Sequence, residues 1–138
     1  MISVRKQEVV KLEDVLHLYQ AVGWTNYTNQ PQMLEQALSH SLAIYLALDG
    51  EAIVGLVCLV GNGFSSIFVQ DLIVLPSYQR QGIGSDLMKE VLGDYKDAYQ
   101  VQLVTEQTEK TLGFYRSLGF ETLSTYDCTG MIWVDRKR

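Results

Sequence analysis

The residues between positions 79 and 85 have the types and spacing needed to bind an anion. They follow an apolar segment that ends at Pro76, and they read Gln79-Arg80-Gln81-Gly82-Ile83-Gly84-Ser85. The first N–H groups of a helix have no partner within the helix, and they lie at the positive end of its dipole. Glycine allows a phosphate to approach this backbone closely. The segment predicts a phosphate-binding helix start, although glycines at a strand–helix junction are equally compatible with a simple turn.

Two common phosphate-binding loops do not match this segment. No Gly-Lys-Ser/Thr follows the glycines, as a P-loop requires. The dinucleotide-binding fingerprint requires a third glycine and an early position in the chain, and both are missing.

Alternating strand and helix patterns surround the segment. Helical spacing of apolar residues, a stop at Gly23 and a helix start at Pro31 predict two early helices. Asp49-Gly50 predicts a hairpin. The expected elements are strands 2–4, 41–48, 52–60, 65–75 and 99–105, helices 12–22, 31–38, 82–93 and 108–118, and a last hairpin of 120–126 with 131–134. Gly55 within its strand predicts a bulge or a close approach.

The segment 79–84 also fits a family pattern, Gln/Arg-x-x-Gly-x-Gly/Ala after a strand. Val74-x-Pro76 precedes it, and a second segment, Phe114-Tyr115-Arg116-Ser117-Leu118-Gly119-Phe120, follows at a typical spacing. With these motifs the chain resembles the GCN5-related N-acetyltransferase (GNAT) family. The resemblance implies a mixed α/β (α+β) fold with a central, mostly antiparallel twisted sheet of about 6–7 strands and about four helices on both faces. The length of 138 residues predicts a single domain over residues 1–138.

The resemblance implies that acetyl-CoA is the co-substrate and that no metal is needed. Backbone groups of Leu72, Ile73 and Val74 would pair with the pantetheine arm. The pyrophosphate would bind to the backbone from Arg80 to Ser85, with Gln79 adding a polar contact. Thr108 stands where many members have an asparagine near pantetheine.

Catalytic roles follow from the same resemblance. Tyr115 occupies the position of the tyrosine that protonates the departing thiolate, although a core aromatic residue is the alternative interpretation. Many members place a glutamate base where this chain has Gln70, which cannot accept a proton. Asp71 is adjacent and should point to the opposite face of a regular strand, but it could act at a bulge. A carboxylate that structures a loop is an equal alternative for Asp71.

The segment after the first predicted helix borders the acceptor site in similar proteins. Trp24 and Tyr27 lie there on a predicted exposed loop, and aromatic rings can bind a cationic amine. The alternative is that both rings pack as a lid over the core.

Composition excludes several functions. The net charge of −5 argues against a nucleic-acid partner, and the only basic run, Arg136-Lys137-Arg138, reads as a frayed tail. Cys58 and Cys128 form no metal-binding pattern. Without a signal-like or membrane-length apolar segment, we expect a cytoplasmic protein with no membrane partner.

The leading hypothesis is direct transfer of an acetyl group from acetyl-CoA to a primary amine of a small molecule or peptide in a ternary complex. One alternative is a catalytically silent acyl-CoA-binding sensor or interaction module, which Gln70 in place of an acid would fit. Another is a purely structural domain. The acceptor and the oligomeric state stay open, and a homodimer is common among similar proteins.

Overall fold

The computed structural model describes residues 1–134, so the basic run Arg136-Lys137-Arg138 lies outside the described residues. The chain divides into two compact units, residues 1–103 and the residues from 104 onward. Each unit is described by itself. The expectation of a single domain stays a prediction.

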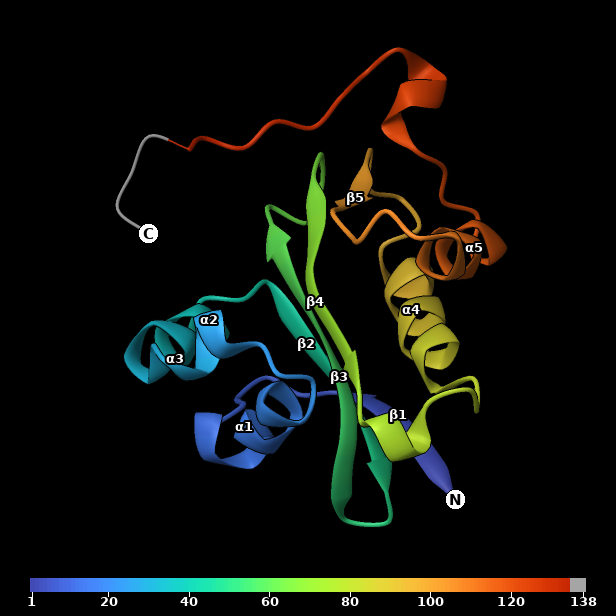
Figure 1. Cartoon of the computed structure of the whole chain (residues 1–138). Helices are drawn as coiled ribbons and strands as arrows, with labels where there is room; N and C mark the ends of the chain where they lie inside the picture. Colours follow the sequence, from blue (N-terminus) through green and yellow to red (C-terminus); the bar gives the residue numbers. More distant parts are fainter. Residues whose placement is uncertain (135–138) are drawn as a thin grey trace. The chain divides into compact units, whose positions relative to one another are not determined.

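The first unit is built on one five-stranded sheet with the order β1-β2-β3-β4-β5 (Figure 1). Neighbouring strands from β1 to β4 run antiparallel, and β5 pairs parallel with β4. The strands are β1 (Ile2–Lys6), β2 (Ala43–Asp49), β3 (Ala52–Gly61), β4 (Ile67–Val74) and β5 (Val101–Leu103).

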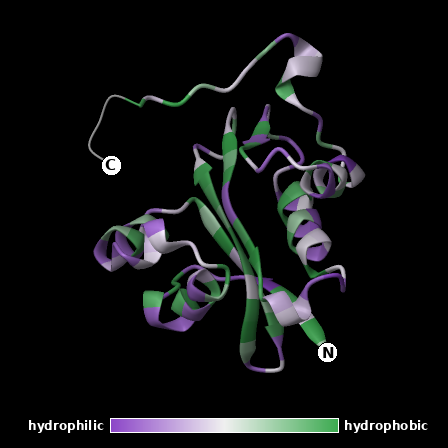
Figure 2. Cartoon of the chain, in the orientation of Figure 1, coloured by the Kyte–Doolittle hydropathy of each residue, from purple (hydrophilic) through white to green (hydrophobic). Residues whose placement is uncertain are grey.

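Helices cover both faces of this sheet. The first three helices pack together on one face, and the fourth lies on the other, against β1 to β4 (Figure 1). They are α1 (Leu12–Ala21), α2 (Thr25–Thr28), α3 (Pro31–Ser39) and α4 (Ile83–Asp94). Hydrophobic residues concentrate along the central strands, whereas the helices carry both hydrophobic and hydrophilic residues (Figure 2). No helix within residues 1–134 is long and apolar enough to cross a membrane.

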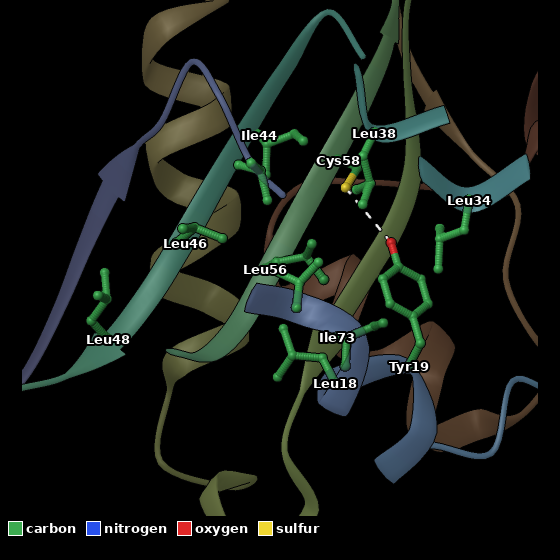
Figure 3. Packing of buried hydrophobic residues seen from close by; sticks show 12 residues of the cluster. Leu18, Tyr19, Leu34, Leu38, Ile44, Leu46, Leu48, Leu56, Cys58 and Ile73 are labelled. Atoms are coloured by element: carbon green, nitrogen blue, oxygen red, sulfur yellow. Dashed lines mark hydrogen bonds between the residues drawn. The ribbon is translucent and has the colours of Figure 1, made fainter. Parts of the chain in front are cut away.

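Two apolar layers hold the helices to the sheet. On the first face, side chains of α1 and α3 meet those of β2, β3 and β4 in the cluster of Figure 3. On the second face, Ile83, Leu87, Met88 and Val91 of α4 are almost fully buried. Burying one such side chain stabilises a fold by about 1.5–3 kcal/mol. The layers therefore hold the helices against the sheet.

Two irregularities interrupt the strand pairing. Between β2 and β3 the register shifts next to Gly55, where an added Cβ would come within 3.0 Å of the Ile73 carbonyl oxygen. Gly55 thus marks both a bulge and a close approach, as predicted. Between β3 and β4, Cys58 pairs with Asp71 and Leu59 with Val69, so Gln70 is the extra residue of a second bulge.

The second unit contains helix α5 (Glu109–Ser117) and the short 3₁₀ helix η2 (Leu123–Tyr126). Thr108 caps α5, because its hydroxyl accepts a hydrogen bond from the Thr111 N–H at 3.2 Å. Gly119 follows the helix with a positive φ of 99°, which glycine adopts without strain.

The structure differs from the sequence-based expectation in three places. The sheet has five strands, fewer than the expected six or seven. Residues 120–134 contain no strand, so the predicted last hairpin is wrong within the described chain. A two-stranded hairpin without a neighbouring strand is marginally stable. Residues 25–28, expected as a loop, form the short helix α2.

Candidate functional site

The turn before α4 has an unusual backbone. Pro76–Tyr78 forms the 3₁₀ helix η1, and the chain then passes through two left-handed residues, Arg80 with φ 65° and Gly82 with φ 81°. Gly82 is the N-cap of α4, and an added Cβ there would meet no atom within 4 Å. Backbone conformation, and not lack of space, therefore favours glycine at position 82. Arg80 adopts its conformation at a cost, since left-handed geometry is unfavourable for residues with a side chain.

The start of α4 carries a run of free donors. The first backbone hydrogen bond of the helix runs from the Asp86 N–H to the Gly82 carbonyl at 2.9 Å. No N–H group from Arg80 to Ser85 donates to another residue within the described chain. These donors lie at the positive end of the helix dipole, which favours a negatively charged ligand. Their contact with a phosphate stays a prediction.

Side chains around the turn hold it in place. The Gln79 Nε2 donates to the Val74 carbonyl at 3.1 Å, and the Tyr78 hydroxyl donates to Asp49 Oδ2 at 2.7 Å. Gln79 therefore ties the turn to the end of β4. The Arg80 side chain is exposed and makes no ion pair with any described residue, so its charge is available to a ligand.

The sheet opens beside β4. Strand β5 pairs only with Ile67–Val69, so no strand in the described chain covers that edge of β4 from residue 70 onward. The Leu75 N–H donates to Val54 in β3 at 2.9 Å. Because successive peptide groups alternate between the two edges of a strand, those of Leu72 and Val74 face the uncovered edge. Ile73 instead faces β3, and its side chain is buried in the core.

The part of β4 that β5 does not cover also carries a buried carboxylate. Asp71 is only 6% exposed. It accepts hydrogen bonds from the Tyr19 hydroxyl to Oδ2 at 2.9 Å and from the Tyr27 hydroxyl to Oδ1 at 3.0 Å. The Tyr19 hydroxyl also lies 3.9 Å from Cys58 Sγ (Figure 3).

The bulge changes which way residues 70 and 71 point. Regular alternation would place Gln70 and Asp71 on opposite faces. Instead, the Gln70 Nε2 donates to the Tyr27 hydroxyl at 3.1 Å, and that same hydroxyl donates to Asp71. Both side chains therefore reach one tyrosine, and the expectation of opposite orientations is wrong because Gln70 is the bulge residue.

Burial dominates the protonation of this cluster. It raises the pKa of the Asp71 carboxyl, while the hydrogen bonds from Tyr19 and Tyr27 act in the opposite direction. Burial also raises the pKa of Tyr27 to about 12 and that of the Cys58 thiol to about 12. Burial, with the electrostatic influence of the neighbouring Cys58 and Asp71, raises the pKa of Tyr19 far above its usual range. Both phenols therefore stay protonated and donate to Asp71.

The two tyrosines that bond the carboxylate form an aromatic cluster with Trp24. Tyr19 meets Tyr27 edge to face at 5.2 Å and Trp24 at 6.2 Å, and the Trp24 and Tyr27 centroids are 6.2 Å apart. Trp24 and Tyr27 are half-buried against the core of the first unit. They therefore pack on the core, and Tyr27 also bonds the exposed Gln70.

Two of the predicted site residues, Tyr115 and Thr108, lie in the second unit. The Tyr115 ring packs edge to face against Phe114 at 4.9 Å and Phe120 at 5.8 Å. Burial raises the pKa of Tyr115, and no described residue hydrogen-bonds its hydroxyl. The Thr108 hydroxyl caps α5 and donates to the Thr111 hydroxyl at 2.9 Å. Its contact with pantetheine stays a prediction.

Sequence reasoning missed two members of the carboxylate cluster, Tyr19 and Cys58. Tyr19 reads as one apolar position of a helix and Cys58 as one position of a buried strand, so neither gives a local signal. The structure also brings Tyr27 to Asp71 through a hydrogen bond and Trp24 to Tyr27 through ring packing. No group of three or more His, Cys, Asp or Glu residues in the described chain is arranged to hold a metal.

This combination of a mixed sheet opening beside β4 and a turn with unpaired N–H groups before α4 agrees with a family comparison. The family model for the acetyltransferase (GNAT) domain matches residues 40–122, more than half of the chain. The chain belongs to the GNAT acetyltransferase family.

Individual relatives agree with this assignment. A solved GNAT-family acetyltransferase from Streptococcus pneumoniae TIGR4 is 77% identical, with a TM-score of 0.92 over 99% of this chain and 100% of that chain. A chloroplastic GCN5-related N-acetyltransferase from Arabidopsis thaliana is 28% identical over 97% of this chain and 68% of its own length. A solved aminoglycoside N-acetyltransferase in complex with CoA is 18% identical, with a TM-score of 0.71 over 100% of this chain and 95% of that chain, which shows a shared fold.

Proposed function

We propose that this protein transfers an acetyl group from acetyl-CoA to a primary amine by direct attack in a ternary complex. The run of free N–H donors from Arg80 to Ser85 carries the proposal, because unpaired donors at a helix start can bind a diphosphate. A fold neighbour was solved in complex with CoA. The thioester of acetyl-CoA supplies the activated acetyl group.

The residues of the turn would bind the co-substrate through backbone atoms. The amides of Arg80, Gln81, Gly82, Ile83, Gly84 and Ser85 would hold the pyrophosphate, and the exposed Arg80 guanidinium would add charge. The Ile83 side chain is buried in the core, so only its backbone is available to a ligand. Gln79 supports the turn from β4 through its bond to Val74.

The uncovered edge of β4 would bind the pantetheine arm. The peptide groups of Leu72 and Val74 face this edge, and an extended amide-containing chain can add to a free strand edge through hydrogen bonds. The same donors would orient the thioester carbonyl.

Tyr115 is the proposed acid that protonates the departing sulfur. Its raised pKa keeps the phenol protonated near neutral pH, and its hydroxyl has no partner among the described residues. Its support comes from the match of Phe114–Phe120 to the family motif and from this free hydroxyl.

The test measures binding and turnover separately. Acetyl-CoA at about a hundredfold its dissociation constant should stabilise the protein by roughly 2.7 kcal/mol, which a thermal unfolding curve detects. Release of free thiol in the presence of a panel of primary amines then reports acetyl transfer. The absence of any acetyl-CoA-dependent stabilisation contradicts the proposed site.

A second candidate function is a catalytically silent acyl-CoA sensor. Gln70 favours it, since an amide stands where the family resemblance implies a base. Stabilisation by acetyl-CoA without thiol release on any amine of the panel would support the sensor. Thiol release that depends on amine concentration would exclude it.

A further inference from the structure

Among the described residues, one hydrogen-bond partner of the buried Asp71 carboxylate leads toward the surface. Asp71 is 6% exposed, and one of its donors, Tyr19, is fully buried. The other donor, Tyr27, is half-buried and bonds the exposed Gln70. A ligand at the surface therefore has a route to Asp71 through the Tyr27 hydroxyl.

Gln70 sets the direction of this route. Its Nε2 donates to the Tyr27 oxygen, so the Tyr27 proton points inward to Asp71 Oδ1. A phenol oxygen has two lone pairs. One accepts from Gln70, and the other accepts from no donor in the part of the chain that the structure describes.

Within residues 1–134, the Asp71 carboxylate has no cationic partner. The groups facing it are Tyr19 from α1, Tyr27 from α2 and Cys58 from β3, and none carries a positive charge. No Lys, Arg or His in the described chain forms a salt bridge with Asp71. A buried carboxylate without a counter-charge is costly. Such a carboxylate beside the Tyr27 ring would attract a cation from outside.

The cluster also lies beside the opening of the sheet. Gln70 and Asp71 follow directly after the last residue of β4 that pairs with β5. Leu72, the next residue, turns its peptide group to the uncovered edge where the thioester is proposed to bind. A donor that reaches Tyr27 is thus near the reacting group.

We infer that the acceptor is a primary ammonium ion, and that the Tyr27 hydroxyl takes its proton while handing its own proton to Asp71. This inference rests on the proposed acetyl transfer. One ammonium N–H bond breaks, the proton joins the Tyr27 oxygen, and the Tyr27 proton moves to Asp71 Oδ1. The neutral amine then attacks the thioester carbon and the C–S bond breaks.

The remaining protons balance in the same scheme. The attacking nitrogen loses its second proton to solvent. The thiolate gains the proton of the proposed acid Tyr115, and Tyr115 regains a proton from solvent. Asp71 later releases its proton to solvent through the Tyr27 hydroxyl. The products are the N-acetylated amine, free CoA thiol and one proton. In this scheme Gln70 is not itself the base. It orients the Tyr27 hydroxyl toward Asp71, which accepts the proton.

Kinetics of three tyrosine variants test the route. We expect kcat/KM of the wild type to rise with pH as Asp71 ionises. Tyr27→Phe should lower kcat at least about tenfold and remove this dependence. Tyr19→Phe also removes a hydrogen bond to Asp71, but Tyr19 does not lie between Asp71 and the surface. This variant should keep the increase of kcat/KM with pH. The increase should move to higher pH, because the Tyr19 bond lowers the Asp71 pKa.

Tyr45→Phe is the matched control. The Tyr45 hydroxyl donates to Asp94 Oδ2 at 2.6 Å on the opposite face of the sheet, so this variant also loses a tyrosine–carboxylate bond. It should keep the wild-type kcat and pH profile. A Tyr27→Phe variant that behaves like Tyr45→Phe overturns the inference.

A readout without turnover follows Asp71 directly. The ¹³C resonance of its carboxyl group is titrated with and without propylammonium chloride, and with tetramethylammonium chloride, which has no N–H to donate. We expect propylammonium to lower the Asp71 pKa in the wild type, tetramethylammonium to lower it less, and Tyr27→Phe to abolish the difference. Equal shifts in wild type and Tyr27→Phe contradict the route.

The two readouts separate failure of the inference from failure of the proposed function. If the wild type acetylates no amine but propylammonium still acts on Asp71 through Tyr27, the ammonium site stands and the enzyme activity fails. If the wild type acetylates amines and Tyr27→Phe changes neither the kinetics nor the Asp71 titration, the activity stands and the inference fails.

Discussion

Two regions of the first unit, on either side of the opening in the sheet, are built in different ways. The turn before α4 offers backbone N–H groups from one continuous segment, Arg80 to Ser85. The cluster around Asp71 gathers side chains from α1, α2, β3 and β4. Backbone sites tolerate changes of side chain as long as the dihedral angles are kept, whereas the carboxylate cluster depends on each hydroxyl. The predictions below test this difference, beginning with the largest effect.

Gly82→Ala tests whether the turn depends on its dihedral angles. Because Gly82 has a φ of 81°, alanine should lower the free energy of unfolding by about 1–2 kcal/mol and weaken acetyl-CoA binding roughly tenfold, about 1.4 kcal/mol. Chemical denaturation and calorimetric titration measure the two effects.

Gly93→Ala provides the control in the same helix. Gly93 has ordinary helical geometry and open space around its Cα, so alanine should raise stability by about 0.5–1 kcal/mol without changing acetyl-CoA affinity. If both alanine variants respond alike, the left-handed conformation at Gly82 is not what the turn requires.

Tyr115→Phe tests a site that depends on one hydroxyl. We expect turnover to fall at least about tenfold, with little change in acetyl-CoA affinity, because the ring still packs against Phe114 and Phe120. Thiol release under chemistry-limited conditions and a CoA titration measure the two quantities. Tyr126→Phe, at an exposed tyrosine of the same unit, should retain full turnover, and unchanged turnover in Tyr115→Phe removes its assigned role.

Arg80→Gly separates charge from backbone strain. Glycine relieves the left-handed conformation of Arg80, so stability should rise by about 0.5 kcal/mol. Loss of the exposed guanidinium should cost about 0.2–1 kcal/mol of acetyl-CoA affinity, an effect that added salt reduces. Arg80→Asn, which also tolerates the left-handed region, should lose the same affinity, and an unchanged affinity in both variants would exclude the cationic contact.

Asp71→Asn should change the slope of stability with pH. Burial raises the folded-state pKa of Asp71, so the folded protein binds this proton more tightly than the unfolded chain. The contribution of Asp71 to stability is therefore full below its unfolded pKa and is lost as pH rises through the folded value. Subtracting the Asp71→Asn curve from the wild-type curve, measured by urea denaturation across this range, should leave that decline. A flat difference would show that Asp71 ionises normally.

The sequence was sufficient to predict features that depend on neighbouring residues. The Asp49-Gly50 hairpin, the helix starts at Pro31 and after Gly82, and the close approach at Gly55 all follow from local backbone chemistry. The alternation rule failed at Gln70, because one inserted residue is invisible in a single strand until its partner is known. For the same reason Tyr19 and Cys58 could not be assigned to Asp71, since packing brings them together across 52 and 13 positions of the chain.

Because β5 pairs with β4 only up to Val69, binding at the rest of this edge can be followed by amide hydrogen exchange. The amides of Leu72 and Val74 face an edge without a strand partner, whereas the Leu75 amide is bonded to Val54. Deuterium should therefore replace hydrogen quickly at positions 72 and 74 and slowly at position 75. A pantetheine chain bound at this edge of β4 would slow exchange at positions 72 and 74 but not at position 75. Slower exchange at these two amides would therefore report that the edge is occupied.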